Sequence, residues 1–186
     1  MSTLPHRSAD GALRLPVVIT LAQGTEVRWR REAPDDAAPL RALRMAVRAP
    51  DFAMLGLASG PLQALCAQQV DSQWRQYRAR FPDLHGEVAE QAGQLVGAMA
   101  WRAERGEAPG LHLVDIVVHP QWQNKGLGTA MLRGLIAYAD TQAVPVRLEV
   151  LRNSTARDWY ARCGFASADA SGLAMHEPMV RPAQRP

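Results

Sequence analysis

The hydrophobic positions between residues 111 and 135 change their period once, from that of a strand to that of a helix. Residues 111–118 are apolar except at His112 and Asp115 and are rich in β-branched side chains, as is typical of a strand in the centre of a sheet. Pro120 cannot donate to a strand ladder and ends this strand. Apolar side chains then recur at helical spacing, at Met131, Leu132 and Leu135. The pattern predicts a strand, a turn and a helix.

The same two periods predict the remaining elements. Alternating apolar and charged positions indicate strands, and apolar positions three or four residues apart indicate helices. Prolines and glycines break both patterns, so residues 49–60 are expected to form a loop or a broken helix. In chain order the expected elements are strand 26–32, helix 35–48, helix 61–80, strands 86–90, 94–104 and 111–118, the helix that follows Gly128, strand 144–151, helix 154–162, and strands 165–170 and 173–180.

This order predicts an α/β (α+β) fold with a mixed, mostly antiparallel central sheet and about four flanking helices, because two of the connections cross over through helices. Residues 1–24 are expected to form an N-terminal arm, residues 25–180 a single domain, and residues 181–186 a disordered tail. Residues 17–21 are compatible both with an extra strand and with the arm.

Composition and charge narrow the function classes. The net charge is +3 and the basic residues are spread along the chain, so we expect no nucleic-acid partner. Cys66 and Cys163 are too few for a disulfide framework and have no ligand partner at short spacing, so we expect free thiols and no metal. There is no apolar run near the ~20 residues of a membrane span, and no convincing secretory signal. A cytoplasmic protein without a membrane partner is expected.

The turn between the strand and the helix has the chemistry of an anion site. A helix N-terminus leaves its first amides unpaired and carries partial positive charge. Gly126 and Gly128 allow a ligand to approach the backbone closely, Lys125 adds a full charge, and the Thr129 hydroxyl adds a donor. These residues taken alone fit a pyrophosphate cradle and an ordinary packing turn equally well. The pattern is neither a Walker loop nor the three-glycine dinucleotide fingerprint.

Two motifs in order resemble the GNAT superfamily of N-acetyltransferases. The stretch VHPQWQNKGLGT (residues 118–129) is similar to its acetyl-CoA loop, Gln/Arg-x-x-Gly-x-Gly/Ala, although Asn124 and Lys125 stand where an Arg-Gly or Gly-Arg pair is common. NSTARDWYARCGF (residues 153–165) resembles its second signature, an Asn followed by a helix with a Tyr and then Gly-Phe. The resemblance implies an N-acetyltransferase domain with a V-shaped splay between the fourth and fifth strands, and acetyl-CoA as acetyl donor.

The resemblance also assigns residues to the donor. It implies that the backbone amides of residues 123–129 hold the pyrophosphate, that Val117 and Val118 pair with the pantetheine arm, and that the Val118 amide polarises the thioester oxygen. Asn153 is expected to contact the pantetheine, and it could also cap the helix that follows. The complete set of expected donor-binding residues is Val117, Val118, Gln123, Asn124, Lys125, Gly126, Gly128, Thr129 and Asn153.

Acetyl transfer to an amine needs a general acid and a general base. Tyr160 is the expected acid, because a phenol of pKa ~10 can protonate a departing thiolate, but its ring could also simply pack against Phe165. His112 and Asp115 are the first candidates for the base, and His112 has the better intrinsic pKa, at ~6.5. Asp115 could instead orient the amine through its charge, and the structural alternatives are a surface His and an Asp paired with a nearby Arg. Glu149 and a water chain are further candidates. Strand alternation predicts that His112 and Asp115 face opposite sides unless a bulge lies between them.

The acceptor is expected to be a primary amine: a free amine, an antibiotic, a polyamine, an amino acid or a protein N-terminus. In GNAT proteins the matching helix pair flanks the acceptor, so Gln73, Trp74 and Tyr77 are expected on the substrate side; core packing is the alternative for each. The final hairpin, with His176, could edge the same pocket. The sequence leaves the oligomeric state open, and a homodimer is one of the alternatives because GNAT domains often dimerise. The competing functions are a non-catalytic acyl-CoA-binding module and a basic nucleic-acid-binding protein.

Overall fold

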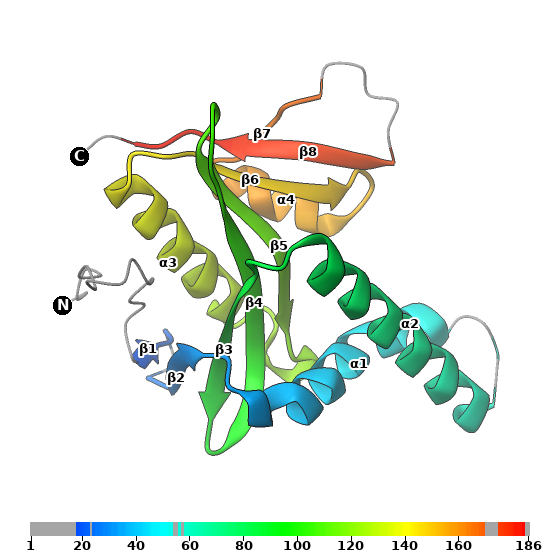
Figure 1. Cartoon of the computed structure of the whole chain (residues 1–186). Helices are drawn as coiled ribbons and strands as arrows, with labels where there is room; N and C mark the ends of the chain where they lie inside the picture. Colours follow the sequence, from blue (N-terminus) through cyan, green and yellow to red (C-terminus); the bar gives the residue numbers. More distant parts are fainter. Residues whose placement is uncertain (1–17, 23, 54–55, 57, 170–174, 185–186) are drawn as a thin grey trace. The chain divides into compact units, whose positions relative to one another are not determined.

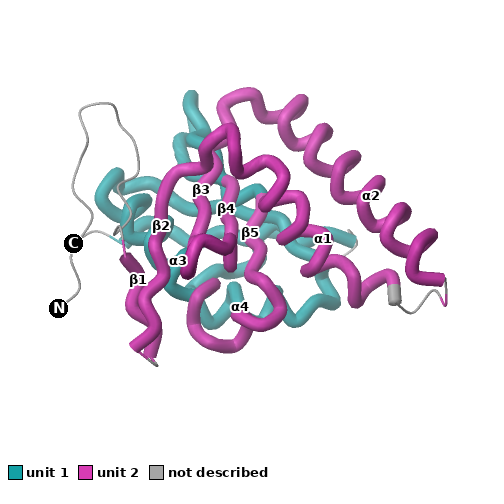
Figure 2. The backbone as a smooth tube through the Cα atoms, turned by 90° about the horizontal axis from the view of Figure 1, so that it is seen from below, with its two compact units in different colours: residues 1–16, 101–114, 129–186 teal, residues 17–100, 115–128 magenta. Residues whose placement is uncertain are grey.

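The chain divides into two compact units, which Figure 2 draws in different colours. In the computed structural model the residues described are 18–22, 24–53, 56, 58–169 and 175–184. Unit 2 consists of residues 17–100 and 115–128, and unit 1 of residues 1–16, 101–114 and 129–186. Strands β4 (Gln94–Glu104) and β5 (Gly110–Val118) and helix α3 (Leu127–Thr141) each run from one unit into the other.

Hydrogen bonding places the eight described strands in the order β1-β2-β3-β4-β5-β6-β8-β7 (Figure 1). Strands β5 and β6 (Val146–Leu151) pair in parallel, from Leu111 with Val146 to Leu113 with Leu148. The pairs β1–β2, β2–β3, β6–β8 and β7–β8 are antiparallel. With helices α1 to α4, this is the predicted mixed fold, and the splay expected between the fourth and fifth predicted strands falls at the parallel pair.

In unit 2 the first strands follow the predicted alternation. Strand β1 (Val18–Thr20) pairs with β2 (Glu26–Arg31), so the stretch left open by the sequence forms an extra strand. Along β2, Val27 and Trp29 are buried, whereas Glu26 and Arg28 are exposed and Arg30 is half-buried. Strand β3 (His85–Gln91) turns into β4 through Ala92 and Gly93, both at positive φ. That backbone matches the twist of a tight hairpin, as the Gln-Ala-Gly sequence predicts.

Helices α1 (Ala37–Ala53) and α2 (Ser59–Arg80) pack side by side in unit 2 (Figure 1). The prediction that the first helix ends near Arg48 is wrong, because α1 continues through Pro50. Proline removes one helical hydrogen bond, and a helix end packed on a partner can tolerate that loss. On the sheet side, Leu40 and Leu43 of α1 pack in a buried cluster with Val88, Ala98 and partly buried Val117.

In unit 1 the core is the apolar face of α3, whose Met131, Leu132, Leu135 and Ala139 are fully buried. Helix α4 (Thr155–Arg162) contacts β6, and Cys163 is its C-cap. Gly164 follows at φ +91, so the helix closes with the predicted Cys-Gly pair. The last hairpin is shorter than expected, with β7 (Ala166–Ser167) paired to β8 (His176–Arg181). Its predicted turn at 171–172 lies outside the described residues.

Candidate functional site

The predicted anion loop begins where β5 ends in unit 2. A single 3-10 turn, Pro120–Trp122, follows the strand, and the His119 amide donates to the Val96 carbonyl at 2.9 Å. The side-chain amide of Gln123 donates to the Val118 carbonyl at 3.0 Å. These two bonds tie the start of the loop to β4 and to the end of β5, so the loop is held at a defined place beside the strand.

The loop backbone is open to a ligand. Asn124 and Gly126 both take positive φ, at 60° and 86°, and a Cβ built on Gly126 meets nothing within 4 Å. Asn tolerates this left-handed region better than most residues, so its presence where the family often has glycine preserves the turn. Residues 123–126 are exposed, and α3 begins at Leu127. An exposed helix N-terminus with free space beside its first turn fits a pyrophosphate.

Three further predicted residues surround the start of α3. Gly128 is the second residue of the helix and not part of the turn itself. The Lys125 ammonium lies 5.5 Å from the Trp122 ring centroid, within the range of a cation–π contact. In unit 1, the Thr129 hydroxyl accepts a hydrogen bond from Trp159 Nε1 at 3.1 Å. A hydroxyl that accepts one bond can still donate its own proton, so the expected role of Thr129 as a donor is compatible with this contact.

Tyr160 lies on α4 within an aromatic cluster. Its ring centroid is 4.7 Å from that of Trp159 and 5.7 Å from that of Phe165, the latter edge to face, and the residue is 8% exposed. The packing against Phe165 that the sequence offered as an alternative is therefore present. It holds the ring in place and is compatible with a chemical role for the hydroxyl.

Helix α4 is fixed to β8 by a buried acid. Glu177 is fully buried, accepts from Arg157 Nε at 2.7 Å, and lies 3.5 Å from Arg152 Nη1. The hydrogen bond from Arg157 lowers the pKa of Glu177, so its carboxylate stays charged. Arg152 also reaches Asp169 at 2.8 Å. This network holds the helix that carries Tyr160.

Asn153 does not cap α4. Ser154 occupies the N-cap position with extended φ and ψ, and its hydroxyl donates to the Leu151 carbonyl at 2.9 Å. The helix starts one residue later than the alternative role of Asn153 requires. Asn153 is exposed, and no hydrogen-bond partner for its side chain is found within residues 18–169 and 175–184 where these are described.

The two main candidates for the base have different partners. In unit 1, His112 Nδ1 lies 3.3 Å from Glu104, which also pairs with Arg147 at 2.9 Å. In unit 2, Asp115 Oδ2 lies 3.5 Å from Arg44 Nε on α1. Burial raises the pKa of Asp115, and the positive charge of Arg44 opposes that rise. Glu149 is exposed on β6, and His176 is exposed at the start of β8.

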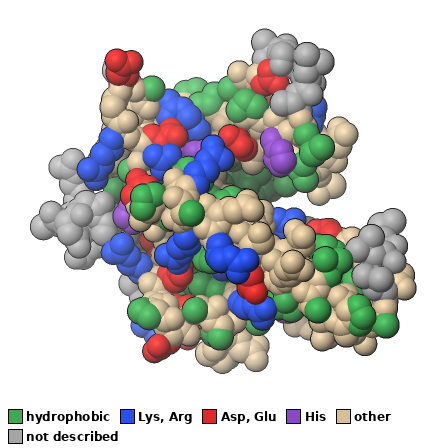
Figure 3. Space-filling model, turned by 45° about the vertical axis from the view of Figure 1, so that its right-hand side comes forward, with side chains coloured by type: hydrophobic (Ala, Val, Ile, Leu, Met, Phe, Trp, Pro, Cys, Tyr) green, Lys and Arg blue, Asp and Glu red, His purple; other side chains and the backbone are tan. Residues whose placement is uncertain are grey.

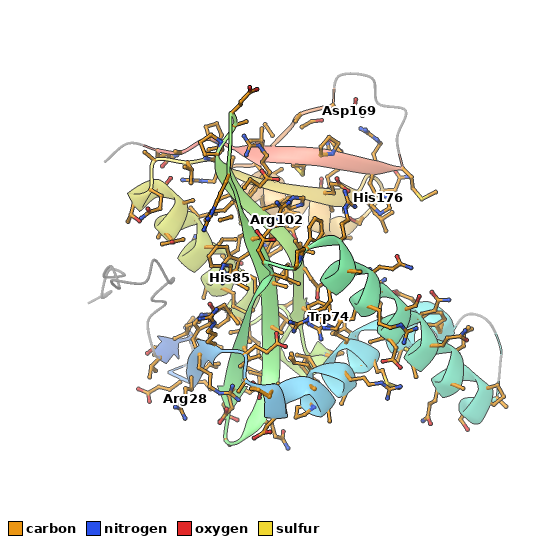
Figure 4. The ribbon with its side chains drawn as sticks, in the orientation of Figure 1. Arg28, Trp74, His85, Arg102, Asp169 and His176 are labelled. Carbon is orange, nitrogen blue, oxygen red and sulfur yellow. The ribbon has the colours of Figure 1, made fainter. Side chains whose placement is uncertain are left out.

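The predicted substrate-side residues form one group on α2 (Figure 4 labels Trp74). The side-chain amide of Gln73 donates to the Tyr77 hydroxyl at 3.0 Å, and the rings of Trp74 and Tyr77 meet edge to face at 6.0 Å. The Arg44 guanidinium lies 3.6 Å from the Trp74 ring centroid. The sequence analysis did not predict that Arg44 joins this group. The signal that the sequence offers for it is a basic residue beside the apolar positions Leu40 and Leu43 of α1.

The described residues contain no group of three or more His, Cys, Asp and Glu side chains that could hold a metal ion. Among the helices that the structure describes, none combines the length and the apolar character that crossing a bilayer demands. On the face drawn in Figure 3, Lys and Arg side chains are interspersed with Asp and Glu.

The chain matches a family model and many solved structures. Residues 49–180 match the model described as an acetyltransferase (GNAT) domain. PaiA N-acetyltransferase from Thermoplasma acidophilum, in complex with coenzyme A, is 16% identical, with a TM-score of 0.61 over 84% of this chain and 98% of that one. The GNAT domain of S. lividans PAT is 16% identical, with a TM-score of 0.62 over 91% and 99%. A search of curated proteins found no match.

Proposed function

Because this chain belongs to the GNAT acetyltransferase family, we propose that it transfers an acetyl group from acetyl-CoA to a primary amine by direct attack in a ternary complex. The observation that carries the proposal is the exposed loop before α3, with Gly126 at positive φ and free space over its Cα. An acyltransferase must first hold its donor, and this loop offers amides, a lysine and room to a diphosphate.

The donor supplies a thioester, whose carbonyl carbon is attacked and whose thiolate leaves. In this proposal the amides of residues 123–129 bind the diphosphate and Lys125 adds charge. The backbone of Val117 and Val118 pairs with the pantetheine arm, and Asn153 contacts it with its unengaged amide. The Val118 amide donates to the thioester oxygen, where negative charge develops.

The transfer forms a bond between the amine nitrogen and the carbonyl carbon and breaks the bond between carbon and sulfur. The proton lost by the amine passes to the base, and the thiolate takes the proton of the Tyr160 hydroxyl. We assign the base to Asp115, because its burial moves its pKa up toward the range in which a base works. His112 and a water chain are the alternatives.

Calorimetric titration with acetyl-CoA tests donor binding. We expect Gly126→Glu to weaken binding by about tenfold or more, because it places a side chain and a negative charge where the diphosphate would lie. The control is Gly24→Glu, since Gly24 also has positive φ and open space at its Cβ but lies in the β1–β2 turn. If Gly126→Glu and the wild type bound acetyl-CoA with equal affinity, the loop before α3 would not be the site of the diphosphate. Binding without turnover on any amine would favour the non-catalytic module.

The pH dependence of kcat tests the base. If Asp115 removes the amine proton, kcat falls toward low pH as Asp115 is protonated, and this fall is the acid limb of the profile of kcat against pH. Asp115→Asn should lower kcat by about 10²–10⁴-fold and remove the acid limb. His112→Asn should keep the limb. The assignment is wrong if Asp115→Asn leaves the profile of kcat against pH unchanged. Loss of the acid limb in His112→Asn would instead assign the general base to His112.

A further inference from the structure

A cavity of about 350 Å³ lies between α1 and α2 in unit 2. Its walls are largely apolar, and Leu40, Val70 and Trp74 are among the lining residues. Four arginines line it, and only two acids do. The four arginines are Arg41, Arg44, Arg75 and Arg78, and the two acids are Glu32 and Asp71. The lining is therefore net positive around an apolar body.

Two of these arginines already have strong partners. Arg41 makes a two-point contact with Asp71, at 2.7 and 2.9 Å, and Arg78 donates to Glu32 at 2.6 Å. Guanidiniums held in this way have their charge balanced by a carboxylate. The two lining acids are thus paired with Arg41 and Arg78, and neither accepts a hydrogen bond from Arg44 or Arg75.

Arg44 is the most buried of the four arginines. Its side chain is 11% exposed, its ring partner is Trp74, and its nearest acid is Asp115, which it reaches only through Nε at 3.5 Å. Within the described part of the chain, its Nη atoms donate to no acceptor. Burial lowers the pKa of this guanidinium, which means that its charge is poorly compensated. These Nη donors are therefore available to an acceptor that enters the cavity.

We propose that this cavity binds the carboxylate of the acceptor on the Nη atoms of Arg44, and that the acceptor is an apolar amino acid. A planar carboxylate matches the two Nη donors of a guanidinium, and the apolar walls match a hydrocarbon side chain. The inference rests on the proposed function. Because the Nε edge of Arg44 faces Asp115, an amine on the same carbon as the carboxylate lies close to the assigned base.

Carboxylate binding is tested without turnover, by calorimetry with 3-phenylpropanoate and 3-phenylpropanamide. Neither probe carries an amine, so the result does not depend on acetyl transfer. We expect the acid to bind at least about tenfold more tightly than the amide, as a charge-assisted pair predicts. Inorganic phosphate is the third probe, and tighter binding of phosphate than of the acid would overturn the carboxylate assignment.

Variants separate Arg44 from the general positive charge of the cavity. Arg44→Gln should remove the preference for the acid, whereas Arg48→Gln, with the same loss of charge one turn further along α1, should keep it because Arg48 does not line the cavity. Arg44→Lys retains a charge beside Asp115 and should show a partial loss, which keeps the test open if Arg44→Gln does not fold. Equal losses in Arg48→Gln and Arg44→Gln would overturn the inference.

Turnover then tests the acceptor assignment. With acetyl-CoA as donor, kcat/KM should be at least about tenfold higher for L-phenylalanine than for L-phenylalaninamide. Arg44→Gln should remove this preference mainly through KM. A neighbouring carboxylate makes an amine harder to deprotonate, so amine basicity would favour the amide and cannot create the preference. Probe binding without the preference would overturn the acceptor role. Failure of acetyl-CoA to bind would instead overturn the proposed function.

Discussion

Tyr160→Phe is expected to lower kcat by about 10²–10⁴-fold while leaving the affinity for acetyl-CoA unchanged. The substitution removes the hydroxyl, which is the expected proton donor, and keeps the aromatic ring. The ring contacts with Trp159 and Phe165 do not involve the hydroxyl, so phenylalanine retains the packing that holds α4. A phenol of pKa ~10 is matched to a departing thiolate of pKa ~8.5, and its loss leaves that thiolate to be protonated by water.

Single-turnover and steady-state rates with a saturating amine measure this effect, and calorimetry measures donor affinity in the same variant. Tyr138→Phe is the matched control, since Tyr138 lies on α3, contacts Trp101 of β4 through its ring and loses the same atom. An unchanged kcat in Tyr160→Phe would show that Tyr160 serves only to pack α4. If Tyr160→Phe lowered the fraction of folded protein as much as it lowered kcat, the conclusion would be the same.

Glu87→Gln is expected to stabilise the protein at pH 8 by up to about 3 kcal/mol. Glu87 on β3 is 7% exposed, and burial raises its pKa to about 7 from the usual 4.5, although Arg31 across the strand pair opposes the rise. Because the folded state binds this proton more tightly than the unfolded state, the favourable contribution is fully present below pH 4.5 and is lost as pH rises through 7. Glutamine avoids ionisation altogether.

Denaturant unfolding of wild type and Glu87→Gln at several pH values between 4.5 and 8 measures the difference. The free energies of unfolding should diverge as pH rises and level off above 7. Glu90→Gln is the control on the same strand, because Glu90 accepts a hydrogen bond from Arg30 at 3.0 Å and its removal should bring no gain at high pH. A constant difference across this range would show that Glu87 does not titrate there.

Local features of the chain could be predicted from the sequence because a few neighbouring residues encode them. The turn of β3 into β4 follows from Ala92 and Gly93, the end of α4 follows from Gly164, and the loop before α3 follows from its glycine pattern. Each depends on backbone conformations that particular residues favour, and the alternation of buried positions gives the order of strands and helices. The same local signals carry the resemblance to the family.

The start and end of several elements depended on more than local pattern. Helix α1 runs past Pro50, and α4 starts after Ser154, which leaves Asn153 outside the helix. Propensity places a helix boundary only to within a few residues, because packing against another element can extend a helix or shorten it. The short β7, expected as a longer strand, differs for a similar reason, since its length is set by pairing with β8.

Sequence by itself determined the family, the glycine-bearing loop before α3 and the helix that carries Tyr160. Only the tertiary structure decided which side chains meet across long stretches of chain. Arg44 and Asp115 are 71 residues apart, and their contact exists because α1 docks beside β5 within unit 2. His112 likewise gains Glu104 through strand pairing. Local preference acts over a few residues, whereas burial and charge at a site come from elements that only folding brings together.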